Sequence, residues 1–295
     1  MEKIGFIGLG KMGYRMSKRM MDRGYKLYVS DIFEKAAEKL VKEGAEFVAK
    51  PAELAKKVNI IFTSVPSGKN LMDIIEGENG LLKTATNKTI LVDVSTVAPK
   101  DSAEIAKKLE TKSIGYLRSS VSGSTKFAEE GTLSVMVSGP KKLYEEVLPL
   151  LKIIGNRQRY LGEAEQSRYM KIAINMMIGT TMQMLAESLV MGEKVGIEWE
   201  VLVECIADSA AATKMIVAKE AALKKRDFTA MSNNRMMVKD MNIAMDIAKT
   251  ENLCLPLTTI TTDFINATIS QGYGDLDHSA ILFTNENLNN IKQEK

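Results

Sequence analysis

The sequence is poor in the residues that form covalent cross-links and metal sites. It has two cysteines among 295 residues, Cys205 and Cys254, and neither lies in a C-x-x-C or metal-ligand spacing. We therefore expect no disulfide framework, no metal site and a cytoplasmic location. The chain has one histidine, His278, although many dehydrogenases and hydrolases use histidine as a base. No serine or cysteine constellation surrounds His278, so we interpret it as a surface or interface residue.

Long apolar runs and blocks of one charge are also absent. No run of about 20 apolar residues predicts a membrane span, and the chain enters "KIGFIGLG" too early for a secretory signal peptide. The 40 basic and 37 acidic residues are interspersed and leave a net charge of +3, which favours a solvated surface over nucleic-acid binding. An apolar content of 45% predicts a soluble globular protein that is long enough for two domains.

The first half of the chain alternates short β-branched runs with amphipathic stretches. This alternation predicts right-handed β-α-β units and a mostly parallel sheet, hence an α/β domain. The expected strands cover residues 3–9, 26–31, 59–65, 89–95, 113–121 and 132–139. Helices are expected over 11–23, 34–43 and 52–57, and Pro140 is expected to end the last strand and open a further helix.

The second half has long helical patterns and few strand signals. One helix of about eight turns is expected over 165–194, because no proline interrupts it and apolar residues cover nearly all its faces. A helix of this kind is typical of a domain boundary or an oligomer core. Further helices are expected around Val201 and Ala210 and over 231–250 and 258–270. We therefore predict two domains, residues 1–163 with the sheet and residues 164–295 entirely helical.

A glycine-rich turn joins the first strand to the first helix. Gly8, Gly10 and Gly13 have G-x-G-x-x-G spacing, with Lys11 and Met12 between the last two. The first glycine permits a tight turn, the second lets the backbone approach a pyrophosphate, and the third lets the helix pack on the strand. This context predicts a dinucleotide-binding loop; the alternative is a simple strand-to-helix turn.

The second strand ends at Asp31, twenty-three residues after Gly8. A carboxylate at this position accepts hydrogen bonds from a ribose 2′-hydroxyl and repels a 2′-phosphate, which favours NAD over NADP. Lys35 nearby would soften that preference. The alternative role for Asp31 is to cap the following helix, and the two roles are compatible.

Two polar residues, Lys171 and Asn175, interrupt the otherwise apolar or small residues of "MKIAINMMIG". They are four residues apart, so a helix places them on one face. A lysine can act as a general base where burial lowers its pKa, and its ammonium form can return the proton in the reverse direction. An asparagine has the donors and the acceptor needed to hold a hydroxyl or carboxylate oxygen. The alternative is a lysine whose stem packs on the core while its head reaches water.

Taken together, these motifs resemble the β-hydroxyacid dehydrogenase family, which includes 3-hydroxyisobutyrate dehydrogenase, tartronate semialdehyde reductase and, more distantly, 6-phosphogluconate dehydrogenase. The resemblance covers nearly the whole chain and is carried by six segments in the family's order. They are "GFIGLGKMGYRM", "DVSTVAP", "SVSGSTKFAEEGTLSVMVSG", "MKIAIN", "KDMNIAMDIA" and "GYGDLDHSA".

The resemblance implies a Rossmann domain, an all-helical C-terminal domain, a long helix between them, and assembly as a homodimer or homotetramer. It implies that Lys171 is the catalytic lysine and Asn175 the substrate-positioning asparagine. It assigns the substrate carboxylate to the loop at Ser122 and Gly123. With Ser124, the backbone N–H groups of this turn and its two serine hydroxyls would bind an anion.

For the cofactor, the resemblance places Val65, Pro66 and Thr96 in the wall beside the nicotinamide, and makes Lys239 a lysine that closes over cofactor and substrate. The alternative for Lys239 is a surface lysine at the start of a helix. The implied activity is NAD-dependent interconversion of a small 3-hydroxy acid and its semialdehyde. The alternatives are a reductase of imines or other C=X bonds, and a dinucleotide-binding module with little activity.

The chain departs from the family pattern in two places that border the expected substrate pocket. Arg118, Ser119 and Ser120 replace an Asp-Ala-Pro approach to the substrate loop, and Ser124 replaces its second glycine. The segment 163–170, "EAEQSRYM", replaces a glycine-rich turn before Lys171. We expect these departures to influence the choice of substrate.

Overall fold

The computed structural model describes residues 2–230 and 232–291 and divides the chain into two compact units, Met1–Lys171 and Ile172–Lys295. The division falls inside a long helix, a few residues later than the boundary expected from the sequence, because the first turn of that helix is hydrogen-bonded to the sheet of the first unit. The helix expected to start at residue 231 has its first position outside the described residues.

The first unit contains one eight-stranded sheet in the order β3-β2-β1-β4-β5-β6-β7-β8. Strands β6 and β7 pair antiparallel, and every other neighbouring pair is parallel, which confirms the α/β class. All six expected strands are present, and β3 and β8 were not expected. The strands are β1 Lys3–Ile7, β2 Lys26–Ser30, β3 Glu46–Phe47, β4 Ile60–Thr63, β5 Ile90–Asp93, β6 Gly115–Ser122, β7 Leu133–Ser138 and β8 Gly155–Gly162.

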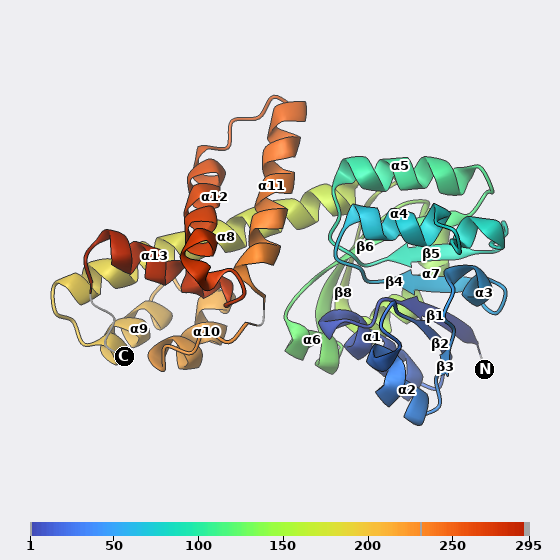
Figure 1. The fold of residues 1–295 in the computed structure, drawn as a ribbon, viewed down its shortest axis with the longest axis horizontal. Coiled ribbons are helices and arrows are strands. Elements are labelled where there is room, and N and C mark those ends of the chain that lie inside the picture. Colours follow the sequence, from blue (N-terminus) through green and yellow to red (C-terminus); the bar gives the residue numbers. More distant parts are fainter. Residues whose placement is uncertain (1, 231, 292–295) are drawn as a thin grey trace. The chain divides into compact units, whose positions relative to one another are not determined.

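Helices cover both faces of this sheet (Figure 1). One face packs against α1, α2, α6 and α7, and the other packs against α3, α4 and α5. The expected helix over 34–43 is a short 3-10 helix, Glu34–Ala37, that leads into α2. The helices are α1 Lys11–Asp22, α2 Glu38–Lys42, α3 Pro51–Ala55, α4 Gly68–Glu76, α5 Pro99–Glu110, α6 Thr125–Glu130 and α7 Lys141–Ile154.

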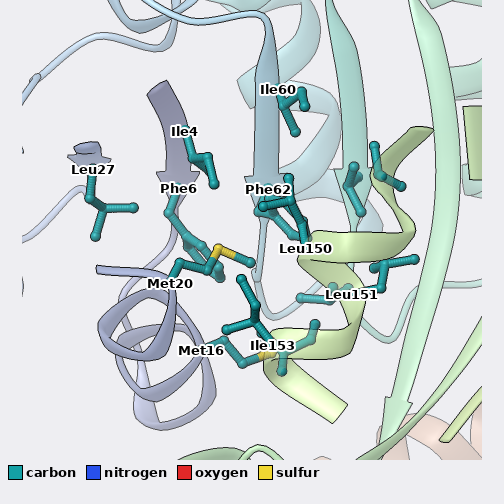
Figure 2. Close-up of a cluster of buried hydrophobic side chains, with 14 of the residues drawn as sticks. Ile4, Phe6, Met16, Met20, Leu27, Ile60, Phe62, Leu150, Leu151 and Ile153 are labelled. Atoms are coloured by element: carbon teal, nitrogen blue, oxygen red, sulfur yellow. The ribbon is translucent and has the colours of Figure 1, made fainter. Parts of the chain in front are cut away.

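The core between the sheet and α1 fixes the cofactor loop in place. Met16 and Met20 of α1 are fully buried against Phe6 of β1 and Phe62 of β4, whose rings stack with centroids 5.9 Å apart. Leu150, Ile153 and other residues of α7 complete the cluster (Figure 2). Burying side chains of this size stabilises the fold by about 1.5–3 kcal/mol each. The glycine turn is therefore anchored on both sides by packed elements.

The second unit is helical, as expected, and in its described residues contains most of α8 Gln166–Lys194 together with five further α-helices and two short helices of other types, Ile269–Tyr273 and His278–Ala280. Its core includes Leu185 and Leu189 of α8, Met241 of α11 and Ile265 of α12. Residues around Ala210 form a turn between α9 and α10, so the helix expected there is wrong. The helices after α8 are α9 Trp199–Ala207, α10 Lys214–Lys224, α11 Asn234–Thr250, α12 Pro256–Thr268 and α13 Ile281–Leu288.

Helix α8 has the expected length but is not buried on all its faces in the single chain. Met177, Met184 and Met191 recur every seven residues, and 71%, 53% and 69% of their surfaces are exposed. Equal spacing of seven residues places them along one stripe of the helix. Among the described residues, none of the helices has the length and apolar character required to cross a bilayer.

Candidate active site

The glycine turn after β1 has the geometry of a dinucleotide loop. Gly8 has φ +91°, and a Cβ atom there would lie 2.2 Å from the carbonyl oxygen of Ser64. A Cβ atom on Gly13 would lie 1.9 Å from the carbonyl oxygen of Gly8, so α1 and the turn approach as closely as glycine allows. Around Gly10, in contrast, no heavy atom lies within 4 Å of the Cβ position. The first and third glycines serve the fold, and the second borders open space.

That open space lies at the N-terminus of α1. Gly10 is the residue before the helix, and no side chain caps the helix end. Lys11 is exposed, whereas Met12 is partly buried against the core. Uncapped backbone N–H groups and the helix dipole favour an anion at this end. The loop therefore fits the pyrophosphate of a dinucleotide.

Asp31 lies at the end of β2, directly beside the glycine turn. Its carboxylate accepts hydrogen bonds from the backbone N–H of Leu9, at 2.6 Å, and of Phe33, at 2.9 Å. Each carboxylate oxygen can accept more than one hydrogen bond, so both remain able to bind a ribose hydroxyl. The alternative that Asp31 caps the following helix is wrong, because the residue before the 3-10 helix is Phe33 and no side chain caps that helix; the Phe33 N–H that Asp31 accepts belongs to the turn before it.

The ends of β4 and β5 meet at a buried carboxylate, Asp93. Its side chain accepts hydrogen bonds from Thr63 Oγ1 and Ser95 Oγ, each at 2.6 Å. Ser95 Oγ in turn accepts a hydrogen bond from the backbone N–H of Val65 at 2.9 Å. Asp93 thus fixes the two loops that contain Val65, Pro66 and Thr96, the residues expected beside the nicotinamide.

All these groups share one edge of the sheet. β1, β2, β4 and β5 are parallel, so their carboxyl ends lie together. β2 and β4 lie on opposite sides of β1, so the strand order reverses direction at β1. Doubly wound sheets bind their ligands at such a switch point. The structure thus brings together the expected cofactor residues of the glycine turn, Asp31, Val65, Pro66 and Thr96.

The expected substrate turn follows β6. Ser122 is the last residue of β6, Gly123 has φ +139°, and Ser124 precedes α6. β6 extends four residues beyond the residue that pairs with the end of β5, which corresponds to about 13 Å. Gly123 is exposed, and Ser122 and Ser124 are partly exposed, so the turn reaches the surface of the sheet unit.

The two departures from the family pattern are in contact with each other. Arg118 Nε donates a hydrogen bond to Glu165 Oε1 at 2.9 Å, and its Nη2 contacts the same oxygen. The backbone N–H of Ser120 donates to Ser167 Oγ at 3.1 Å, and Ser167 Oγ donates to the Met136 carbonyl at 2.7 Å. Residues from 118–120 and 165–167 therefore join the start of α8 to β6 and β7.

A second arginine, Arg168, is the largest fully buried side chain of the chain's described part. Its guanidinium forms an ion pair with Asp93 and donates to Tyr116 Oη at 3.0 Å. Burial acts to lower the pKa of Arg168, but Tyr116 and Asp93 outweigh burial and raise it. Burial also raises the pKa of Tyr116. The site therefore holds a permanently charged guanidinium beside a neutral phenol.

Lys171 lies one turn after Arg168, within the sheet unit, and is half-buried. Asn175 lies in the helical unit, is 6% exposed, and donates from Nδ2 to Asp240 Oδ2 at 2.6 Å. The other carboxylate oxygen of Asp240 lies 3.1 Å from Lys239 Nζ. Lys239 lies within α11 and not at its start, and its side chain shares the Asp240 carboxylate with Asn175.

Of the two roles expected for His278, surface or interface residue, the first is wrong for the single chain. Only 7% of His278 is exposed, and its Nδ1 lies 3.2 Å from the Ser232 carbonyl oxygen. The preceding Asp277 is equally buried and forms an ion pair with Lys219 of α10 at 2.5 Å. The local sequence "GDLDHSA" does not contain this lysine, which is why the buried cluster was not expected.

Three residues of the site region were missed in the sequence: Asp93, Arg168 and Asp240. Asp93 and Asp240 belong to segments already recognised. The signal for Asp93 was its place at the end of an expected strand, and the signal for Asp240 was its place directly after Lys239. Arg168 lies in segment 163–170, which was recognised as a departure from the family pattern, but the polar residues directly before it gave no reason to single it out. Its partners are 52 to 75 residues away in sequence, so no local pattern identifies them.

A doubly wound sheet with an open glycine turn and a carboxylate at the end of its second strand is typical of a dinucleotide-binding fold. Residues 3–162 match the family model described as the NAD-binding domain of 6-phosphogluconate dehydrogenase. Residues 166–284 match the model described as the NAD-binding domain of NADP-dependent 3-hydroxyisobutyrate dehydrogenase. The chain belongs to the β-hydroxyacid dehydrogenase family of NAD(P)-dependent oxidoreductases.

Individual relatives match over almost the full length. The 2-(hydroxymethyl)glutarate dehydrogenase of Eubacterium barkeri is 33% identical over 281 residues, which cover 95% of this chain and 93% of that protein. The 2-hydroxy-3-oxopropionate reductase of Escherichia coli K12 is 29% identical, covering 98% and 99%. A solved structure of 3-hydroxyisobutyrate dehydrogenase from Salmonella typhimurium superimposes with a TM-score of 0.88 at 23% identity, covering 96% of this chain and 99% of that chain.

Proposed function

We propose that this dehydrogenase interconverts a 3-hydroxy carboxylate and its semialdehyde, with Lys171 as the general acid and base. The observation that carries the proposal is the position of Lys171 directly after a turn that buried hydrogen bonds attach to the cofactor-binding sheet. A proton carrier must keep a fixed distance from the reacting oxygen, and this attachment supplies a rigid base for it.

The substrate carboxylate would bind the turn at Ser122, Gly123 and Ser124 through backbone N–H groups and hydroxyls. Lys171 would take the hydroxyl proton during oxidation and return it during reduction. Asn175 would hold the oxygen that Lys171 protonates, and its Nδ2 is itself oriented by Asp240. Bound at the glycine turn, NAD(P) supplies the hydride acceptor or donor.

The names of three relatives support this substrate class. A hydroxymethyl group at carbon 2 of glutarate, the aldehyde of 2-hydroxy-3-oxopropionate and the hydroxyl of 3-hydroxyisobutyrate all lie two carbons from a carboxylate. The common unit is a carboxylate, one carbon, and the carbon that gains or loses hydride. We therefore infer that the distance between the carboxylate-binding turn and Lys171 matches the length of this three-carbon unit.

The experiment is a screen of short 3-hydroxy acids and their semialdehydes by NADH and NADPH absorbance, with 2-hydroxy acids and plain alcohols as controls. With the best substrate, Lys171→Ala is expected to lower kcat by roughly a hundredfold or more, since general acid–base catalysis contributes 10²–10⁴. Binding of NADH, followed by its fluorescence, is expected to stay close to that of the wild type. Normal turnover by Lys171→Ala would rule out this residue as the proton carrier.

We further propose a preference for NAD over NADP. The Asp31 carboxylate faces the glycine turn through its bond to the Leu9 N–H, so a 2′-phosphate there would meet a negative charge. We also propose that Thr96, Val65 and Pro66 border the nicotinamide and that Lys239 contacts bound cofactor. A cytoplasmic location is supported by the free, exposed thiols of Cys205 and Cys254.

We propose a homodimer or homotetramer in which α8 contributes to the contact between copies. The exposed stripe of Met177, Met184 and Met191 supports this, because large apolar side chains in a row favour burial. Met184→Glu is expected to weaken the assembly, measured by light scattering across protein concentrations, with unchanged far-UV circular dichroism. A wild-type protein that is monomeric at every concentration tested would contradict the proposal.

A further inference from the structure

We propose that Arg168 is a positioning residue, which holds Lys171 at a fixed distance from the loop that contains Thr96. The inference rests on the proposed role of Lys171 as proton carrier. It concerns a residue that touches neither substrate nor cofactor and acts through the turn of α8 on which Lys171 lies. All the groups involved belong to the sheet unit.

The guanidinium of Arg168 binds groups from four separate segments. Nη1 donates to the backbone carbonyl of Ser95 at 2.7 Å, and Nη2 donates to Asp93 Oδ2 at 2.5 Å. Nη2 also donates to Tyr116 Oη at 3.0 Å, and Nε donates to Ser102 Oγ at 3.3 Å. The end of β5, the loop after it, α5 and β6 are therefore joined at one side chain, only 1% of which is exposed.

The bond to the Ser95 carbonyl matters most for the reaction, because Thr96 is the next residue. Ser95 also donates from Oγ to Asp93 and accepts from the Val65 N–H, so both nicotinamide-side loops end in the same network. Arg168 and Lys171 are three residues apart on α8 and lie on adjacent positions of one helix face. A shift of the Arg168 turn thus moves Lys171 relative to Thr96.

Stability alone does not explain a buried arginine at this position. Desolvation of two buried charges offsets most of their attraction, and apolar residues of similar size often stabilise a protein as well or better. What apolar side chains cannot provide is a planar donor set that fixes several acceptors in direction and distance. A positioning role uses that property of the guanidinium.

The first turn of α8 has a second, independent attachment that allows variants of Arg168 to fold. Arg118 pairs with Glu165, and Ser167 bonds both the Ser120 N–H and the Met136 carbonyl. These bonds hold the turn to β6 and β7 but do not involve the loop at Ser95 and Thr96. Loss of Arg168 should therefore loosen that loop relative to Lys171 without detaching the helix.

The test uses two variants, the single variant Arg168→Gln and a double variant that carries both Arg168→Met and Asp93→Asn. The control is Lys219→Met. The double variant avoids leaving a buried carboxylate without its cation. Lys219 forms a comparably buried ion pair with Asp277 in the helical unit, so its loss costs stability away from the proposed catalytic residues. For each full-length protein we would measure the thermal midpoint, kcat, the KM of NADH and substrate, and the pH dependence of kcat. Deuterium exchange of segments 94–98 and 166–172 is followed in parallel.

We expect the Arg168 variants to lower kcat roughly tenfold to a hundredfold, as small misplacements of a reacting group do. The KM of NADH should change less than about twofold, the pH profile of kcat should shift, and exchange should rise in 94–98 and 166–172. Lys219→Met should lower the thermal midpoint with wild-type kcat. If the Arg168 variants only lose thermal stability and retain the wild-type kcat, pH profile and exchange, the inference is wrong.

The outcome for Arg168 is separable from that for the proposed function. An active Lys171→Ala protein would remove the proton-carrier role, and a positioning role toward Lys171 would go with it. An inactive Lys171→Ala protein combined with unaffected Arg168 variants would overturn the positioning role alone. Should no substrate be turned over, unchanged exchange in 94–98 and 166–172 of the Arg168 variants would by itself overturn it.

Discussion

The carboxylate of Asp31 has a structural role in the glycine turn and a proposed role in binding the cofactor ribose. Its hydrogen bonds allow the two roles to be tested separately. One oxygen fixes the glycine turn through the Leu9 N–H, and the other receives the Phe33 N–H. An asparagine at this position keeps an acceptor oxygen for the turn but removes the negative charge. The charge, and not the side-chain shape, is what opposes a 2′-phosphate.

Asp31→Asn is therefore expected to reduce the ratio of kcat/KM for NAD to that for NADP by roughly tenfold, about 1.4 kcal/mol. Steady-state kinetics with both cofactors measures this ratio. Asp31→Glu, which retains the charge, is the control and should retain the preference for NAD. An Asp31→Asn enzyme with an unaltered cofactor ratio would show that the ribose is read by other groups.

Side chains recognised by a local motif were predictable, and those defined by distant partners were not. Gly8, Gly10, Gly13 and Asp31 lie within a spacing whose geometry follows from one strand and one helix. The buried pair of Arg168 and Asp93, in contrast, joins residues 75 apart in sequence. Complementary charge between two such segments becomes visible only when the fold brings them together.

The glycines of the β1–turn–α1 element have different roles. A Cβ on Gly13 would collide with the Gly8 carbonyl, whereas a Cβ on Gly10 would meet no protein atom within 4 Å. Gly13 is thus required for the packing of the helix on the strand. Gly10 leaves room that only a bound ligand would need.

Gly10→Ala is expected to unfold at the wild-type temperature but to raise the Kd of NADH about tenfold or more, because the methyl group occupies the pyrophosphate position. Gly13→Ala, its matched partner, should lower the free energy of unfolding by at least about 2 kcal/mol, as overpacking does. Thermal unfolding and NADH fluorescence titration measure the two effects. Unchanged NADH affinity in Gly10→Ala would mean that the cofactor does not approach this turn.

Strands and helices with a strong apolar period were predictable from the sequence. The two strands that were not predicted lack such a period. β3 has two residues, Glu46 and Phe47, too few for a period. β8 reads "GNRQRYLG" and lies at the sheet edge, where most of its side chains are exposed or half-buried. Edge strands gain their structure from one neighbour and not from burial, so their composition is not strand-like.

At the level of the complete chain, the single histidine provides a clean probe of stability against pH. Burial, followed by the charge of Lys219, lowers the pKa of His278 in the folded protein. The unfolded chain binds a proton at the ordinary value of about 6.5. The contribution of neutral His278 to the free energy of unfolding is therefore complete above about pH 6.5. It decreases as the pH falls below that value, because the unfolded state binds the proton more readily.

We expect the free energy of unfolding to be lower at pH 5.5 than at pH 7, measured by urea unfolding in buffers of equal ionic strength. His278→Gln should flatten this dependence. The neighbouring Asp277 does not interfere in this range: burial acts to raise its pKa, but His278 and Lys219 together hold it below the ordinary value. Its contribution is lost only in more acidic solution. An equally steep pH dependence in His278→Gln would assign the effect to other groups.

The contact between Arg118 and Glu165 has a consequence for changing this enzyme's specificity. Both positions belong to the segments that depart from the family pattern, so a library of specificity variants would naturally include them. Exchanging Arg118 alone for the acidic residue usual in the family would place two carboxylates together in a buried position, and exchanging Glu165 alone would strand a buried guanidinium. Each single exchange is therefore expected to destabilise the fold, whereas exchanging both partners together leaves neither charge buried without its counterpart. The two sites are thus epistatic, and useful variants will be found only by mutating them in the same clone.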